Sequence, residues 1–125
     1  MLERDAFSAW LGIEVESVGP GRATISFVLR DEMCNGFGTA HGGVPHAAAD
    51  SAFAFACNSR GRKAVAAETT MSYLRPLLSG DRVRIECTEL HRSRRLGRYQ
   101  ALLTRGEERV ALFYATCYVL EEAWT

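Results

Sequence analysis

One segment of this chain constrains its fold more than any other: residues 44–57, which read VPHAAADSAFAFAC. Alanine is the best helix former, Pro45 suits a first helical turn, and Asn58 to Gly61 provide a stop. The segment therefore predicts one helix of about four turns at roughly 3.6 residues per turn. Because this helix is apolar on nearly every side, other elements must surround it.

Alternating apolar and polar residues on both sides of this segment predict strands. Residues 22–30 alternate after a turn at 19–21, which predicts a hairpin with residues 13–18, and residues 3–10 could form a short leading helix. Three later segments alternate in the same way: residues 81–89, 98–104 and 110–120. The order is two strands, one long helix and about four antiparallel strands. We therefore expect an α+β fold in which a curved sheet encloses the helix.

The length and charge of the chain limit its partners. Its 125 residues predict a single domain, residues 1–125. The 15 basic and 15 acidic side chains cancel, so we expect no nucleic acid and no membrane as partner. The first twelve residues lack the basic segment and apolar run of a secretory signal, and no run of roughly 20 apolar residues follows, so we expect neither a signal peptide nor a membrane helix. The four cysteines form no CxxC pair, so we expect a reduced, cytoplasmic protein without a metal site.

Asp50 is the only carboxylate in the predicted helix. Burying an ionised carboxylate without partners is costly, so a protein that keeps one there usually pairs it or uses it. Asp50 is therefore a candidate catalytic group. The alternative is that Asp50 lies on the one wet edge of the helix or caps a neighbouring backbone.

The residues His41-Gly42-Gly43 precede the helix. The first N–H groups of a helix have no partner within it and carry partial positive charge, and glycine lets a substrate approach the backbone. A developing oxyanion would be stabilised there. Asp50 lies about 12 Å further along the helix, at roughly 1.5 Å per residue, and hardly reaches a carbonyl bound at Gly42. A dimer that places Asp50 of one chain opposite Gly42 of the other would solve this geometry.

Together, Asn35, His41-Gly42-Gly43 and Asp50 form the pattern N-G-x4-H-G-G-x6-D. This pattern resembles the hotdog-fold acyl-CoA thioesterases, most closely the phenylacetate-pathway subgroup. The segments DSAFAFACNSRG (50–61) and SYLRPLLSGD (72–81) strengthen the resemblance, which covers nearly the whole chain. It implies a hotdog fold, a curved antiparallel sheet of about five to six strands wrapped around one long central helix.

The resemblance also implies roles for four catalytic residues. Asp50 acts as nucleophile or general base, and the Gly42 N–H polarises the thioester carbonyl. Asn35 positions the attacking group, and His41 organises the loop. Asp50 comes from one subunit and the other three residues from its partner, in a homodimer or a homotetramer. Further residues are expected around the substrate: Gly43, Thr70, Tyr73, Arg75, Arg94 and Arg95.

The sequence leaves two parts of the substrate site undecided. Thr70 is one of a pair, Thr69-Thr70, that matches a polar site position only loosely, and Met33, Phe37 and Phe53 are candidates for the acyl pocket. The run HRSRRLGR (91–98) could bind the phosphates of coenzyme A or form a solvated surface. Other cationic candidates for the same phosphates compete with it: Arg60, Arg62, Lys63 and Arg75.

The expected activity is hydrolysis of a small aryl-acetyl or medium acyl-CoA to free acid and coenzyme A. No cofactor is expected, because coenzyme A is part of the substrate. One alternative is a hotdog 3-hydroxyacyl dehydratase, although such enzymes usually place the histidine before an aromatic-proline turn. Another is a non-catalytic acyl-CoA binding protein that uses the same pocket.

Overall fold

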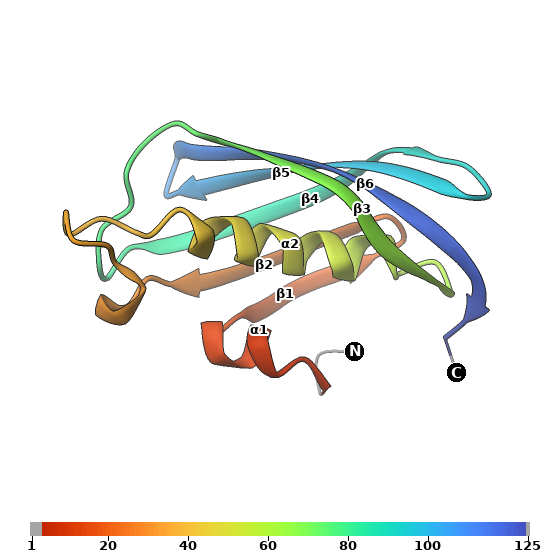
Figure 1. The fold of residues 1–125 in the computed structure, drawn as a ribbon, viewed down its shortest axis with the longest axis horizontal. Helices are drawn as coiled ribbons and strands as arrows, with labels where there is room; N and C mark the ends of the chain where they lie inside the picture. Colours follow the sequence, from red (N-terminus) through yellow and green to blue (C-terminus); the bar gives the residue numbers. More distant parts are fainter. Residues whose placement is uncertain (1–3, 125) are drawn as a thin grey trace.

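A curved sheet of six strands wraps around one long helix (Figure 1). The computed structural model describes residues 4–124. Within them, the elements are α1 (Ala6–Leu11), β1 (Glu14–Gly19), β2 (Arg22–Val28), the 3₁₀ turn η2 (Asp31–Met33), α2 (Gly43–Cys57), β3 (Arg62–Tyr73), β4 (Arg82–Arg92), β5 (Leu96–Arg105) and β6 (Glu108–Ala123). The strand order is β1-β2-β4-β5-β6-β3, and every neighbouring pair is antiparallel. The predicted α+β arrangement is confirmed.

The core lies between α2 and the concave face of the sheet. Small side chains on α2 let the strands approach its backbone closely, and four of them are fully buried: Ala48, Ala49, Ala52 and Ala56. Phe53 fills the remaining space, with its ring 5.5 Å from Tyr99 of β5 and 6.1 Å from Phe113 of β6. Within residues 4–124 no helix is long and apolar enough to cross a membrane.

The C-terminal end of α2 is fastened to the sheet by side chains. The Asn58 amide donates hydrogen bonds of 2.8 Å to the Ala54 carbonyl and 3.1 Å to the Ala64 carbonyl of β3. The Arg92 guanidinium, from β4, donates one of 3.1 Å to the Cys57 carbonyl. The Arg92 bond supplies a partner for one of the last carbonyls of the helix, and the Asn58 amide joins the helix end to β3.

The predicted helix 44–57 is confirmed to within one residue, since α2 spans Gly43–Cys57. The predicted leading helix at 3–10 appears as α1, Ala6–Leu11, and residue 3 lies outside the described residues. The one strand that alternation did not locate is β3. It lies at an edge of the sheet, pairs with β6, and its register shifts at two places.

Candidate active site

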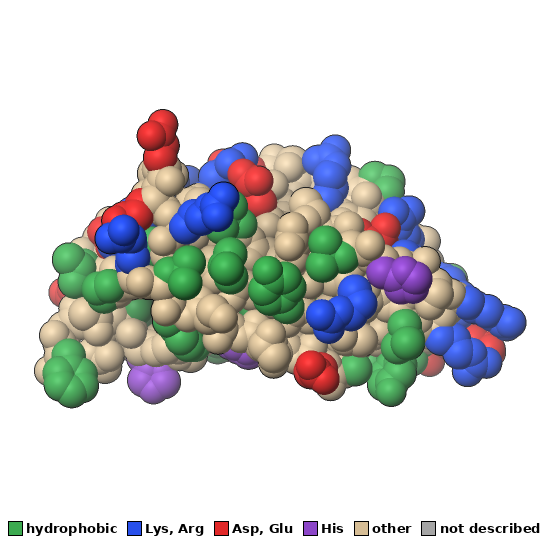
Figure 2. All heavy atoms as spheres, turned by 90° about the horizontal axis from the view of Figure 1, so that it is seen from above, with side chains coloured by type: hydrophobic (Ala, Val, Ile, Leu, Met, Phe, Trp, Pro, Cys, Tyr) green, Lys and Arg blue, Asp and Glu red, His purple; other side chains and the backbone are tan. Residues whose placement is uncertain are grey.

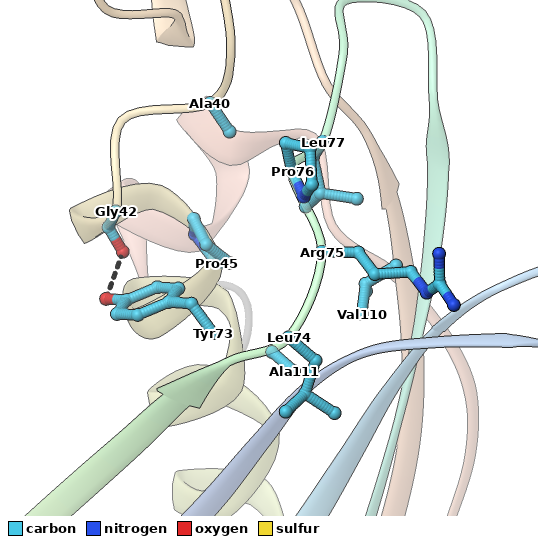
Figure 3. Close-up of a pocket in the computed structure, with 10 residues that line it drawn as sticks. All are labelled: Ala40, Gly42, Pro45, Tyr73, Leu74, Arg75, Pro76, Leu77, Val110 and Ala111. Carbon is cyan, nitrogen blue, oxygen red and sulfur yellow. Dashed lines mark hydrogen bonds between the residues drawn. The ribbon is translucent and has the colours of Figure 1, made fainter.

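Gly42 occupies the N-cap position of α2, with φ −55° and ψ −28°. The Tyr73 hydroxyl, at the end of β3, donates a hydrogen bond of 2.7 Å to the Gly42 carbonyl oxygen (Figure 3). A Cβ at Gly42 would lie 3.2 Å from that hydroxyl oxygen, so a side chain here would press against Tyr73. Within residues 4–124 the Gly42 N–H has no hydrogen-bond acceptor, which leaves it able to donate to a bound oxygen.

His41 shapes the entry to the helix. Its N–H donates to the Met33 carbonyl at 2.9 Å, and its Nδ1 accepts a hydrogen bond of 3.0 Å from the Gly43 N–H. Because Nδ1 is the acceptor, the neutral ring carries its proton on Nε2. The ring is exposed, so that this N–H faces solvent or a ligand.

Asn35 organises the loop before His41. Its Oδ1 accepts hydrogen bonds from the Phe37 N–H at 2.9 Å and the Thr39 N–H at 3.3 Å, and its Nδ2 donates to the Thr39 hydroxyl at 3.2 Å. Both ends of the amide are therefore engaged within the loop. Phe37 stands at the tip of that loop with 93% of its surface exposed.

A cavity of about 310 Å³ opens beside the N-terminus of α2 (Figure 3). It is lined by Ala40, Gly42, Pro45, Tyr73, Leu74, Arg75, Pro76, Leu77, Val110 and Ala111. Three predicted site residues, Gly42, Tyr73 and Arg75, thus lie around one space. The Arg75 guanidinium points away from Gly42 and pairs with the Glu108 carboxylate at 3.2 Å. The cavity is at the small end of the range for ligand pockets.

Asp50 lies two turns further along α2 and does not line this cavity. The other two polar side chains of the helix have partners. The Ser51 hydroxyl contacts the Ser8 hydroxyl of α1 at 2.8 Å, and His46 Nε2 lies 3.1 Å from the Thr69 hydroxyl of β3. Asp50 accepts no hydrogen bond from any residue between 4 and 124.

The surroundings of Asp50 disfavour its charge. Burial raises the pKa of the Asp50 carboxyl above its usual range, and the negative charge of Asp5 raises it further. The charge of His46 acts in the opposite direction and lowers this pKa. A carboxyl that is partly buried, without hydrogen-bond partners and shifted in pKa is a candidate for a functional group.

The remaining predicted residues lie elsewhere in the protomer. Thr70 is exposed, and its neighbour Thr69 is the one that meets α2. Arg94 and Arg95 lie in the β4–β5 turn, at the opposite end of α2 from Gly42 (Figure 1). Figure 2 shows basic side chains gathered at that end of the molecule. Met33 and Phe53 are both buried in the core, and neither lines the cavity.

Comparison with known proteins decides the family. The sequence model of the thioesterase superfamily matches residues 37–112. The chain belongs to the thioesterase superfamily. It is 37% identical to the acyl-coenzyme A thioesterase PaaI of Escherichia coli K12 over 114 residues, which are 90% of this chain and 81% of that protein.

Solved structures agree with this assignment. The structure of E. coli PaaI matches with a TM-score of 0.97 at 34% identity, covering 100% of this thioesterase and 91% of that chain. The TT0310 protein of Thermus thermophilus matches with a TM-score of 0.91 at 43% identity, covering 94% of this thioesterase and 99% of that chain. The predicted hotdog fold and the resemblance to the phenylacetate-pathway subgroup are confirmed.

Sequence reasoning missed some features of the candidate site. The contact between His46 and Thr69 joins residues 23 positions apart and has no signature in the sequence. The cavity wall formed by Leu74, Pro76 and Leu77 lies in the segment that carried the family resemblance, yet nothing in its pattern assigned it to a pocket. Arg92 belongs to the basic run but serves the helix, since it donates to the Cys57 carbonyl and to the Tyr99 hydroxyl.

Proposed function

We propose that this thioesterase hydrolyses acyl-coenzyme A, with a small aryl-acetyl or medium acyl group, to a free acid and coenzyme A. The proposal rests on one observation: an N–H at Gly42 and a carboxylate at Asp50, both without a hydrogen-bond partner among residues 4–124, stand on the same helix, too far apart to act on one carbonyl. Its likeness to E. coli PaaI, an acyl-coenzyme A thioesterase, supports the substrate class.

Gly42 has the chemistry to stabilise the transition state. When a nucleophile attacks the thioester carbonyl, the oxygen gains negative charge. The N–H at a helix N-terminus, together with the helix dipole, stabilises that charge more than the uncharged ground state. Removal of one such donor from an acyl-transfer site typically lowers kcat about 10²- to 10³-fold.

Asp50 supplies the attacking group or activates it. As a nucleophile, its carboxylate attacks the carbonyl carbon, the C–S bond breaks, coenzyme A leaves as the thiolate and takes a proton, and water then hydrolyses the mixed anhydride. As a general base, it takes a proton from the water that attacks the carbonyl directly. Both routes need the ionised carboxylate, so its raised pKa sets the acid limit of activity.

A homodimer brings the two groups together. Thr69 and Tyr73 of β3 contact α2 at His46 and Gly42, so the free edge of β3 runs alongside the first half of the helix. A second copy that pairs antiparallel with this edge would bring its own α2 alongside. Positions 42 and 50 are symmetric about His46, so a twofold axis near Thr69 would set each Gly42 opposite the other copy's Asp50.

The same dimer gives a role to the basic turn. In one protomer Arg94 and Arg95 lie far from Gly42, but the antiparallel arrangement carries the β4–β5 turn of one copy to the Gly42 end of the other. The side chain of Arg94 is 76% exposed, which leaves it available to the phosphates of coenzyme A. We place Arg94 and Arg95 there as phosphate-binding residues.

We further propose that two dimers associate into a homotetramer and that the enzyme acts in the cytoplasm. The outer face of the sheet supports the association. Leu102, Leu112 and Tyr114 line a shallow groove there, flanked by Glu86 and Arg109. A second dimer turned by a twofold axis would set acidic and basic side chains opposite each other across this groove.

The substitution Asp50→Asn tests the proposal. It keeps the shape of the side chain and removes the charge, so kcat should fall about 10²- to 10⁴-fold while substrate binding persists. Because the pKa of Asp50 is raised in the folded state, its ionisation disfavours folding. The variant should therefore match the parent in stability near pH 3 and exceed it above the folded-state pKa of the carboxyl.

Thiol release from phenylacetyl-CoA, melting temperature and oligomer size should be measured on one preparation. A fall in kcat with an intact, stable oligomer supports the proposal. A folded, oligomeric Asp50→Asn protein that is nearly as active as the parent contradicts it.

A further inference from the structure

His46 has no part in the reaction described so far, yet it occupies a defined place beside Asp50. It lies four residues before Asp50 on α2, and side chains at this spacing share one face of a helix. Both positions face away from the fully buried alanine stripe, and both are only partly buried. The two side chains are therefore neighbours along one exposed strip of the helix.

The His46 ring is held in place from two sides. Its Nε2 lies 3.1 Å from the Thr69 hydroxyl of β3. The ring packs edge-to-face with Phe113 of β6, with ring centroids 5.6 Å apart and planes at 67°. A side chain fixed by two strands cannot swing freely into solvent, so any charge on this ring stays close to Asp50.

Two ionisable groups act on the partly buried carboxyl of Asp50. His46 lies on the same helix, and Asp5 lies in the segment before α1. Burial and Asp5 oppose the negative charge on Asp50, while His46 favours it. Among residues 4–124, His46 is the one group that favours the ionised carboxylate through its charge.

We propose that His46 is a positioning residue whose protonated ring, anchored on Thr69, keeps Asp50 ionised under mildly acidic conditions. Histidine changes charge between about pH 5 and 8, so it is positively charged under the acidic conditions in which a carboxylate with a raised pKa takes up a proton. A positive charge on the ring stabilises the neighbouring carboxylate.

The functional side of this inference rests on the proposed role of Asp50. If Asp50 is the attacking or basic group, His46 extends the working range of the enzyme toward acid. In the proposed dimer the His46 ring of the second copy would lie near the twofold axis. Its positive charge would also favour the ionised form of Asp50 in both copies.

The test compares the parent with His46→Gln in the assembled oligomer. Glutamine is uncharged at every pH and can still donate a hydrogen bond to Thr69. The acid limb of kcat/KM against pH should move upward by about 0.5 to 1 unit, and the two proteins should converge near pH 8.5. The matched control is Thr69→Val, which removes the anchor but keeps the imidazole. Its acid limb should move by less than half as much.

Carbon-13 NMR of the Asp50 carboxyl measures the effect of His46 on Asp50 ionisation independently of enzyme activity. Its titration midpoint should rise in His46→Gln by the amount that the acid limb rises. An unchanged Asp50 titration overturns the inference, whatever Asp50 does in catalysis. A raised titration with an unchanged acid limb supports the coupling and instead overturns Asp50 as the group that limits activity. The two failures are thus distinguishable.

Discussion

The two ends of α2 are built in opposite ways. At the C-terminal end, side chains of Asn58, Ser59 and Arg92 donate to the last carbonyls of the helix and tie them to the neighbouring strands. At the N-terminal end, the Gly42 N–H has no acceptor within residues 4–124 and stands beside an open cavity. The closed end fixes the helix, and the open end keeps a polar group available for a ligand.

On the proposed mechanism, a small hotdog protein separates stability from chemistry along one element. Unsatisfied helix-terminal groups are costly when they are buried, so the closed end uses a charged donor and an amide. The open end tolerates a free donor because it faces the cavity rather than the core. Substitutions at the closed end should therefore change stability, and substitutions at the open end should change kinetics.

The largest effect is expected at the open end. Gly42→Val fills the space between the backbone and the Tyr73 hydroxyl and blocks the approach of a carbonyl oxygen. We expect kcat/KM to fall about 10²- to 10³-fold, as for loss of an oxyanion donor. The φ of −55° suits any residue, so a loss of unfolding free energy would come from displacement of the Tyr73 ring and not from the backbone. Gly42→Ala should give a smaller fall, and equal activity in all three proteins would remove Gly42 from the site.

At the closed end we expect the reverse. Arg92→Met removes the donor to the Cys57 carbonyl and to the Tyr99 hydroxyl. The free energy of unfolding in urea should fall by about 1.5–3 kcal/mol, the range for hydrogen bonds to charged groups. kcat/KM well below the melting temperature should stay within about twofold of the parent. The matched change Arg98→Met, on the exposed outer face, should cost no more than about 0.5 kcal/mol. A large fall in kcat/KM for Arg92→Met would contradict the proposed difference between the two ends of α2.

A smaller effect, on KM rather than on stability, is expected for Arg94 and Arg95 of the basic run. Replacing Arg94 and Arg95 together by Ala should raise KM for acyl-CoA about three- to tenfold at low salt, with kcat and stability unchanged. The effect should shrink as salt is added. Arg84→Ala, also exposed and ion-paired on the outer face, is the control and should leave KM unaltered. An unchanged KM in the double variant would assign the turn to solvated surface.

The sequence predicted the fold well where side-chain patterns are regular. The alanine-rich helix and the strictly alternating strand at 81–89 lie where they were expected, because each buries one continuous face. Strand β3 gave no such pattern. It is an edge strand with two register shifts, so its inner and outer faces do not alternate cleanly along the sequence.

The candidate site was predictable only in part. The glycine at position 42 and the carboxylate at position 50 carry their chemistry in the residue type. The contact of Thr69 with His46 has no such signature in the residue type. On a strand, a shift of one residue exchanges the two faces, so only packing decides that Thr69 rather than Thr70 meets α2. Likewise, Arg92 and Arg94 look alike in sequence, and burial alone gives them different roles.

The central claim is that Gly42 of one copy and Asp50 of the other form each active site. It is tested most directly by mixing two inactive variants, Asp50→Asn and Gly42→Val, through coexpression or subunit exchange. If sites are shared, mixed dimers contain one intact site and one doubly altered site. Since about half of randomly paired dimers are mixed, activity should return to about one quarter of the parent's. If a mixture forms mixed dimers but is no more active than either variant alone, each site lies within a single chain and the account is wrong.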